Sequence, residues 1–233
     1  MSLMTVYHGS SKIIKLPEYG VGGENNDYGK GFYLTEYSYL AGEWAVLWTR
    51  KNGYINEYAY NTGELFSEDI ESHSPALKIL TLDSLSVESW IAVLLDNREG
   101  DFLEDPISED TAVKFKHKYL PALSEYDIIT GWRADDSYFR YAEDFVAGRL
   151  SLENLEKALK FGDLGQQICI KSEDAFDKRR WEFVTAHNAK VEHFYRAASN
   201  RDSEARKGYS NLIKDAGARS GTLIDDLLRI HGV

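Results

Sequence analysis

The chain has 233 residues, of which 43% are hydrophobic and 13% aromatic, enough for one sizeable core with an appendage. A formal charge of -11 argues against broad electrostatic attraction to nucleic acid or to an anionic membrane, and a basic protein partner fits better. No apolar run approaches the roughly 20 residues that span a bilayer and no secretion signal is evident, so we expect a cytoplasmic protein.

The first half of the chain shows short β-prone runs separated by a glycine-rich loop and helical segments. The first strand ends at Gly9-Ser10 and delivers His8 to a turn. The loop contains five glycines, which let the backbone lie close to a ligand. We predict strands at residues 5–8, 32–34, 54–60 and 77–80, the loop at residues 18–31, and helices at residues 37–48, 86–97 and 110–118.

The second half continues this alternation and then changes character. We predict strands at residues 126–131 and 167–170, helices at residues 137–147 and 151–160, and a helix start at residues 172–176. Ser151 is the expected N-cap of its helix. Beyond residue 183 charged residues of both signs dominate, which favours solvated helices over a nucleic-acid site. The expected organisation is a domain at residues 4–183 and a helical C-terminal extension at residues 184–233.

Several reactive residue types have ordinary structural explanations. Cys169 lies among apolar neighbours, which favours a buried thiol over a nucleophile and leaves no disulfide framework. Asp135 and Asp136 could serve acid/base or metal chemistry, but paired acids before a helix are more often caps. His187 and His193 are six residues apart, unlike a one-turn metal pair, so we expect no zinc site and no other metal.

Two short motifs carry the functional information. Tyr-His-Gly-Ser occupies residues 7–10, and Tyr-Gly-Lys-Gly-Phe-Tyr-Leu-Thr occupies residues 28–35. Together they resemble the NAD-binding half of an ADP-ribosyltransferase of the His-Tyr-Glu type, the group that includes the poly(ADP-ribose) polymerases and diphtheria toxin. The resemblance implies NAD as the ligand, bound as a substrate.

The resemblance also implies a role for each motif residue. His8 would hydrogen-bond the adenosine ribose, and Gly9 would hold the nicotinamide carboxamide through its backbone N–H and C=O. Ser10 would add a hydroxyl to that carboxamide. Tyr33 would stack on the nicotinamide ring, and Lys30 would face the acceptor side, although a solvated lysine fits equally well.

Two further residues complete the implied site. Trp44 stands at the offset of the polymerases' second stacking tyrosine, but it also shares an apolar helical stripe with Leu40 and Leu47, which by itself favours core packing. Gln167 begins the predicted strand at residues 167–170, at the position where those enzymes carry a glutamate that stabilises the oxocarbenium ion. Glutamine can orient the ribose but lacks the charge, so chain elongation is not expected.

The chain resembles domain-of-unknown-function family 3990 more closely, over most of residues 5–177. That bacterial family is thought to be related to ADP-ribosyltransferases. Its shared features are the two motifs, the Trp-Ala pair at residues 44–45, the segment at residues 126–139 and the Gln-Gln-Ile-Cys strand at residues 166–169. The resemblance therefore implies that glutamine is usual in this family at the position of the His-Tyr-Glu glutamate.

These resemblances imply an α+β fold: an ADP-ribosyltransferase-like split antiparallel β-sheet core with flanking helices and NAD in the cleft between its halves. The expected activity is that of a mono-ADP-ribosyltransferase of the toxin or delivered-effector kind, with an unknown protein or other acceptor. A non-catalytic NAD or ADP-ribose binding module is the second hypothesis, because the catalytic glutamate is replaced. Plain NAD hydrolysis is the third.

Overall fold

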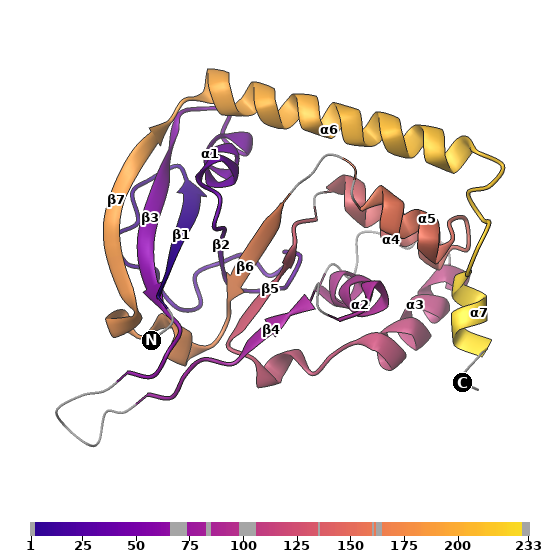
Figure 1. Cartoon of the computed structure of the whole chain (residues 1–233), viewed down its shortest axis with the longest axis horizontal. Helices are drawn as coiled ribbons and strands as arrows, with labels where there is room; N and C mark the ends of the chain where they lie inside the picture. Colours follow the sequence, from indigo (N-terminus) through magenta and orange to yellow (C-terminus); the bar gives the residue numbers. More distant parts are fainter. Residues whose placement is uncertain are drawn as a thin grey trace.

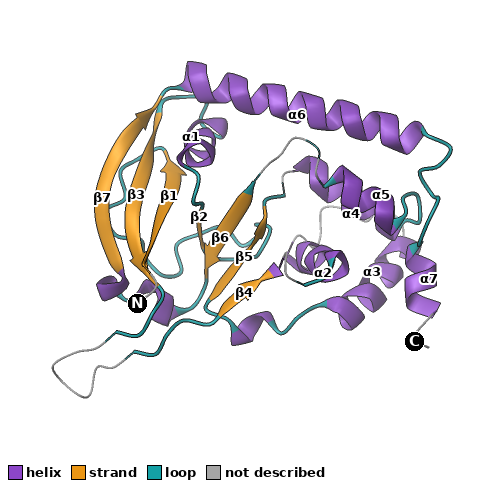
Figure 2. Ribbon diagram, viewed as in Figure 1, coloured by secondary structure: helices purple, strands orange, loops and turns teal. Residues whose placement is uncertain are grey.

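The computed structural model of the chain describes residues 3–65, 74–82, 85–97, 106–134, 136–159, 161 and 165–229. Within these residues the fold is mixed α+β, with two β-sheets beside a group of helices (Figure 1). One long helix, α6 (Val191–Lys214), runs from one of the two sheets to the helical group, as Figure 2 shows.

The first sheet has three strands in the described part of the chain, β1 (Leu3–Ser10), β3 (Gly53–Asn61) and β7 (Trp181–Ala189), in the order β1-β3-β7. Both pairings are antiparallel, and β3 shifts register against β7 between Glu57 and Tyr58. Helix α1 (Ser38–Leu47) packs on β1 and β3. Small residues face the sheet there, which lets the helix backbone approach the strands closely.

The second sheet has four described strands, β2 (Phe32–Leu34), β6 (Gln166–Ile170), β5 (Ile128–Trp132) and β4 (Ile79–Thr81), paired in that order. The β2–β6 and β5–β6 pairs are antiparallel, as expected. The β4–β5 pair is parallel, which corrects the wholly antiparallel expectation. The chain between these two strands contains the helices α2 (Val87–Asn97) and α3 (Pro106–Tyr119), which provide the long crossover that a parallel pair requires.

The two sheets meet at Thr35, directly after β2. Its backbone N–H and C=O exchange hydrogen bonds with Tyr7 of β1, at 3.0 and 2.8 Å. Its hydroxyl donates to the backbone carbonyl of Gln166 in β6, at 3.0 Å. Thr35 is fully buried, so the last residue of the second motif ties both sheets together beside His8 and Gln167.

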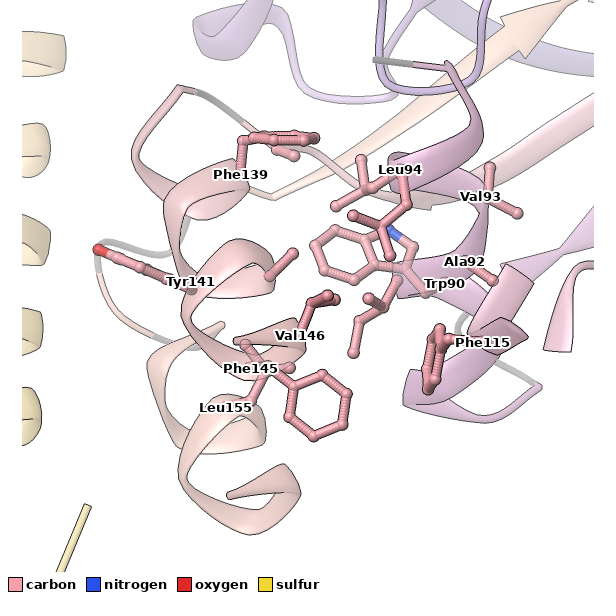
Figure 3. Close-up of a cluster of buried hydrophobic side chains, with 14 of the residues drawn as sticks. Trp90, Ala92, Val93, Leu94, Phe115, Phe139, Tyr141, Phe145, Val146 and Leu155 are labelled. Atoms are coloured by element: carbon pink, nitrogen blue, oxygen red, sulfur yellow. The ribbon is translucent and has the colours of Figure 1, made fainter. Parts of the chain in front are cut away.

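Four helices pack against one another and against the second sheet: α2 (Val87–Asn97), α3 (Pro106–Tyr119), α4 (Asp136–Val146) and α5 (Leu152–Ala158). Figure 3 shows their apolar side chains gathered around Trp90, with Phe115, Phe145 and Leu155 facing it from the other helices. These side chains are almost completely buried, so their apolar area is a main source of stability. The predicted cap is confirmed, because the Ser151 hydroxyl accepts from the N–H of Asn154 at 3.4 Å.

The remaining helical elements lie mostly near the C-terminus. They are α6 (Val191–Lys214), α7 (Ile224–Arg229) and the short 3-10 turns η3 (Leu123–Glu125), η4 (Glu173–Phe176) and η5 (Lys178–Arg180). The helix start predicted at residues 172–176 is the 3-10 turn η4, capped by Ser172. None of the helices in the described ranges combines the length and apolar composition needed to cross a lipid bilayer.

Residues 184–189 differ from the prediction. They were expected to be helical, but they form the second half of β7, so the expected boundary at residue 184 lies inside a strand. Trp181 and Phe183 pack their rings against Tyr58 of β3, at centroid distances of 5.5 and 6.0 Å. These long-range aromatic contacts hold the strand, although its outward residues are polar.

Candidate functional site

A cavity of about 870 Å³ is lined by residues from both sheets, from α1 and α6, and from the glycine-rich loop. It brings together five of the predicted site residues: His8, Gly9, Tyr33, Trp44 and Gln167. These residues are up to 159 positions apart in the sequence, and the pairing of β2 with β6 and the joint at Thr35 place them around one space. The volume falls in the range of small-molecule and cofactor sites.

His8 lies in β1, two residues before the end of the strand, and its ring is neutral. Its Nδ1 lies 2.7 Å from the backbone oxygen of Tyr33, and because a carbonyl only accepts, Nδ1 carries the proton. Burial lowers the pKa of His8 to about 4, and the bond to the Tyr33 carbonyl opposes this effect only in part. The ring also stacks on Phe32 at 4.2 Å. His8 therefore presents Nε2 as a hydrogen-bond acceptor at neutral pH.

Tyr33 is fixed by the loop that precedes it. Its hydroxyl donates to the backbone oxygen of Gly29 at 2.7 Å and accepts from the backbone N–H of Tyr28 at 3.0 Å. Burial raises the pKa of the phenol well above its ordinary value, with Cys169 and Asp27 adding to the effect. The hydroxyl is thus neutral and occupied by the protein, which leaves the ring as the part of Tyr33 that a ligand would contact.

Gln167 is held by a carboxylate that the sequence did not single out. Its Nε2 donates to Oδ2 of Asp27 at 2.7 Å, and that oxygen also accepts from the backbone N–H of Ala134 at 2.9 Å. Gln167 is 3% exposed and Asp27 is 4% exposed, and both line the cavity. Because the donor end of the amide faces Asp27, its carbonyl oxygen Oε1 is turned away as an acceptor. Asp27 directly precedes the second motif, which was the only signal for it.

Trp44 faces the cavity and not the core. The sequence favoured core packing with Leu40 and Leu47, but only Leu40 of the three is fully buried. Trp44 and Leu47 both line the cavity, and the guanidinium of Arg133 lies 5.7 Å from the centre of the Trp44 ring. The side of α1 that packs on the first sheet consists of smaller apolar residues, so two of the three large side chains, Trp44 and Leu47, lie at the cavity.

A buried ionic cluster lies next to Trp44. Glu43 is 3% exposed at its side chain and contacts two guanidiniums, Arg133 at 3.7 Å and Arg201 more closely. Burial raises the pKa of Glu43, and the two arginines oppose the shift. All three residues line the cavity. They come from α1, the end of β5 and α6, so only the folded chain reveals the cluster.

Gly9 and Ser10 have different positions. Gly9 lines the cavity where β1 passes under α1, and a Cβ there would collide with the backbone oxygen of Ala41 and lie 2.7 Å from the Ala45 nitrogen. Glycine is therefore required for this close approach. The Ser10 hydroxyl donates to the Lys12 carbonyl at 2.5 Å, and Ser10 is not among the residues lining the cavity in the described structure.

Lys30 also lies away from the main cavity. It lines a smaller hollow of about 210 Å³ with Lys171 and Phe176, and its amine is 3.9 Å from Glu24. Val21 and Gly31 belong to both hollows, so the two are neighbours across the loop. This position fits either of the two expectations for Lys30, an acceptor-side residue or a solvated lysine.

The other reactive residues stand as follows. Cys169 is fully buried in β6, and burial raises its pKa to about 11, which confirms a structural thiol. Asp135 lies outside the described residues, and Asp136 is the first residue of α4. His187 lies in β7, 3.7 Å from Glu57, and His193 lies in α6. Across the described ranges, no group of three or more potential ligands could hold a metal ion.

Helix α6 forms one wall of the cavity. Tyr195, Ser199 and Arg201 line the cavity from this helix, and Figure 1 shows α6 passing along α1. Phe194 seats the helix on α1 at Gly42, where a Cβ would lie 2.5 Å from the ring carbon Cζ. The segment expected to be an appendage is therefore part of the site.

Comparison with known proteins places most of the chain in one family. Residues 4–181 match the model of the family described as Protein of unknown function (DUF3990). No curated protein and no solved structure gives a significant match. The matched segment begins in β1 and ends at the first residue of β7, so α6 lies beyond it. Because the match covers well over half of its length, the chain belongs to the DUF3990 family.

Proposed function

We propose that this protein binds NAD in the main cavity and transfers ADP-ribose from it to an acceptor, releasing nicotinamide. The observation that carries the proposal is the convergence of His8, Tyr33, Trp44 and Gln167 on one cavity of about 870 Å³. A resemblance in two short motifs predicted that these residues serve one ligand, and a shared cavity is what that prediction requires.

Each residue offers the group that its proposed role needs. The ring of Tyr33 stacks on nicotinamide, because its hydroxyl is already bonded to the loop. Nε2 of His8 accepts a hydrogen bond from a hydroxyl of the adenosine ribose, because Nδ1 donates to the Tyr33 carbonyl. Trp44 provides a second aromatic surface, and Gly9 brings bare backbone to the cavity wall.

Transfer breaks the bond between C1′ of the ribose and the nicotinamide nitrogen, and the electron pair leaves with nicotinamide. The acceptor's nucleophilic atom then forms a bond to C1′ and loses its proton to water. Oε1 of Gln167 accepts from a hydroxyl of the nicotinamide ribose and orients it. The Asp27 carboxylate bonded to Nε2 polarises the amide and so increases the negative charge on Oε1 beside the oxocarbenium ion.

The fold is consistent with this proposal. Two sheets that meet at Thr35, with residues of both lining the cavity, support the proposal, because the resemblance implies a split sheet with the ligand between its halves. The parallel β4–β5 pair at the far edge of the second sheet is a departure that lies away from the motif residues.

A binding module that senses NAD or ADP-ribose is the second candidate. The buried, uncharged Gln167 favours it, because a cationic transition state gains less from an amide than from a carboxylate. NAD hydrolysis, with water as the acceptor, is the third outcome of the same test.

The experiment incubates the purified protein with NAD labelled in its adenylate part and a cell lysate, and follows nicotinamide release and labelled products. Tyr33→Ala and Gln167→Ala remove the proposed contacts. Tyr37→Ala and Gln166→Ala are matched controls, because both residues are exposed and do not line the cavity in the described structure.

Label on an acceptor that only the cavity variants abolish supports the transferase. Release of nicotinamide without a labelled acceptor indicates hydrolysis. Calorimetric binding of NAD with neither release nor label indicates a sensor, and the absence of NAD binding overturns the proposal.

A further inference from the structure

We propose that Arg133 and Arg201 form a subsite for the pyrophosphate of a nucleotide in the main cavity. This inference deepens the proposed function, because it names the part of NAD that the four motif residues leave unassigned. The ligand class is a diphosphate ester such as ADP-ribose, ADP or a dinucleotide.

The two arginines reach the cavity from separate elements and converge on one carboxylate. Arg133 follows β5, and Arg201 projects from α6. Both contact Glu43 of α1, and their side chains are only 13% and 17% exposed. A guanidinium held by a buried partner loses little further side-chain entropy when it binds a ligand, so the cluster is preorganised for phosphate.

The cluster brings two guanidiniums together at the cavity. Arg133 and Arg201 both contact Glu43, and interactions with charge are stronger where water is largely excluded. The chain carries a formal charge of -11, yet basic and acidic side chains are equal in number around the cavity. The basic ones are Lys12, Arg133, Arg201 and Arg206, and the acidic ones are Glu18, Asp27, Glu43 and Asp202.

The position of the cluster also fits a dinucleotide. The backbone N–H of Arg133 donates to the Gly165 carbonyl at 3.1 Å, directly before the strand that carries Gln167. Glu43 adjoins Trp44 on α1, and the Arg133 guanidinium lies over the Trp44 ring. The phosphates would thus lie beside the ribose that Gln167 orients, between the two sugars of NAD.

The test measures binding by calorimetry with three probes: ADP-ribose, inorganic pyrophosphate and nicotinamide. Arg201→Gln and Arg133→Gln remove one guanidinium each. Arg196→Gln is the matched control, because Arg196 is an exposed residue of the same helix and does not line the cavity in the described structure. Arg201→Lys keeps the charge but removes the fork of donors.

We expect each Gln variant to lower the affinity for ADP-ribose and for pyrophosphate about tenfold or more, because one or two charge-assisted hydrogen bonds are lost. The affinity for nicotinamide should not change. Arg201→Lys should lie between the wild type and Arg201→Gln, which separates lost binding from lost folding. The control should bind like the wild type.

The two proposals fail separately. Arginine-dependent binding of ADP-ribose and pyrophosphate without NAD turnover supports the subsite and removes the transferase. NAD turnover with unchanged ADP-ribose affinity in both Gln variants overturns the subsite and leaves the transferase. A wild-type protein that binds neither phosphate probe also overturns the subsite.

Discussion

Oδ2 of Asp27 receives the side-chain amide of Gln167 at 2.7 Å inside a cavity where both residues are almost completely buried. The bond fixes which end of the amide faces a ligand. It also places a carboxylate one hydrogen bond behind the glutamine, which stands where the ADP-ribosyltransferases that the motifs resemble carry a glutamate. Asp27 is therefore a positioning residue for the proposed reaction.

The first prediction concerns this pair. Asp27→Asn keeps the size of the side chain but removes its charge and allows the Gln167 amide to turn over. We expect kcat for nicotinamide release to fall about tenfold and KM for NAD to change less than about threefold. Steady-state kinetics with NAD measures the two constants.

Asp110→Asn is the matched control, because Asp110 is an exposed carboxylate of α3 paired with Lys114 at 2.6 Å. Thermal unfolding identifies any loss of folded protein in either variant. Equal kcat values for Asp27→Asn and the wild type would remove the positioning role.

The second prediction follows from the pKa of His8. Its folded pKa of about 4 lies below the ordinary value near 6.5, so the unfolded chain binds the proton more readily. The stability that comes from neutral His8 is present above pH 6.5 and is lost as the pH falls from 6.5 toward 4. The loss should reach at most about 3.5 kcal/mol, from about 1.4 kcal/mol for each unit of the pKa difference.

Urea unfolding at several pH values measures this effect as the difference between wild type and His8→Gln. That difference in unfolding free energy should shrink toward acid pH. His117→Gln is the control for the loss of a histidine as such, because His117 is an exposed residue of α3, and it shows which part of the pH dependence does not come from His8. A constant difference for His8→Gln would contradict the prediction.

The third prediction tests the contact between β1 and α1. Gly9→Ala places a methyl group against the Ala41 carbonyl and the Ala45 nitrogen, which are backbone atoms that cannot rotate away. We expect a loss of about 2–4 kcal/mol in unfolding free energy, typical of severe overpacking. Gly23→Ala is the control, because its Cβ would meet only the Asn26 side chain at 3.4 Å. Similar stability for both variants in urea would show that α1 yields easily.

The fourth prediction concerns the seating of α6. Gly42→Ala pushes the Phe194 ring away from α1, so α6 should exchange its amide hydrogens faster while the second sheet does not. The double variant Gly42→Ala/Phe194→Ala removes the ring that is pushed. The amide hydrogens of α6 should exchange at the same rate in the double variant as in Phe194→Ala alone. If they exchange more slowly in Gly42→Ala than in the wild type, the clash is excluded. Hydrogen-exchange mass spectrometry measures all four proteins.

Local signals predicted most of the elements. The strand at residues 32–34 has the observed bounds, and the predicted cap at Ser151 is present. These features depend on neighbours in sequence: alternation of apolar residues, glycine punctuation and a side chain that reaches three residues ahead. The second half of β7 was missed because its backbone pairs with residues 53–57 of β3, which are more than 120 positions away in the sequence.

The candidate site was predictable only in part, and for the same reason. Motif spacing placed His8, Tyr33 and Gln167, because the resemblance supplied their roles. It could not supply the contacts of Glu43 with Arg133 and Arg201, since those residues are up to 158 positions apart and no local pattern marks them. Trp44 was ambiguous because a stripe of large apolar residues looks the same whether it faces a core or a cavity.

Helix α6 spans the distance between the first sheet, with its helix α1, and the helical group. Its 24 residues make a rod about 36 Å long, seated at one end by Phe194 on α1 and at the other by Tyr209. Tyr209 stacks on Tyr141 of α4 at 3.7 Å and donates to Asp144. The residues with which α6 lines the cavity, from Tyr195 to Arg206, all lie between these two seats. Any displacement of either seat would therefore also displace this wall of the cavity.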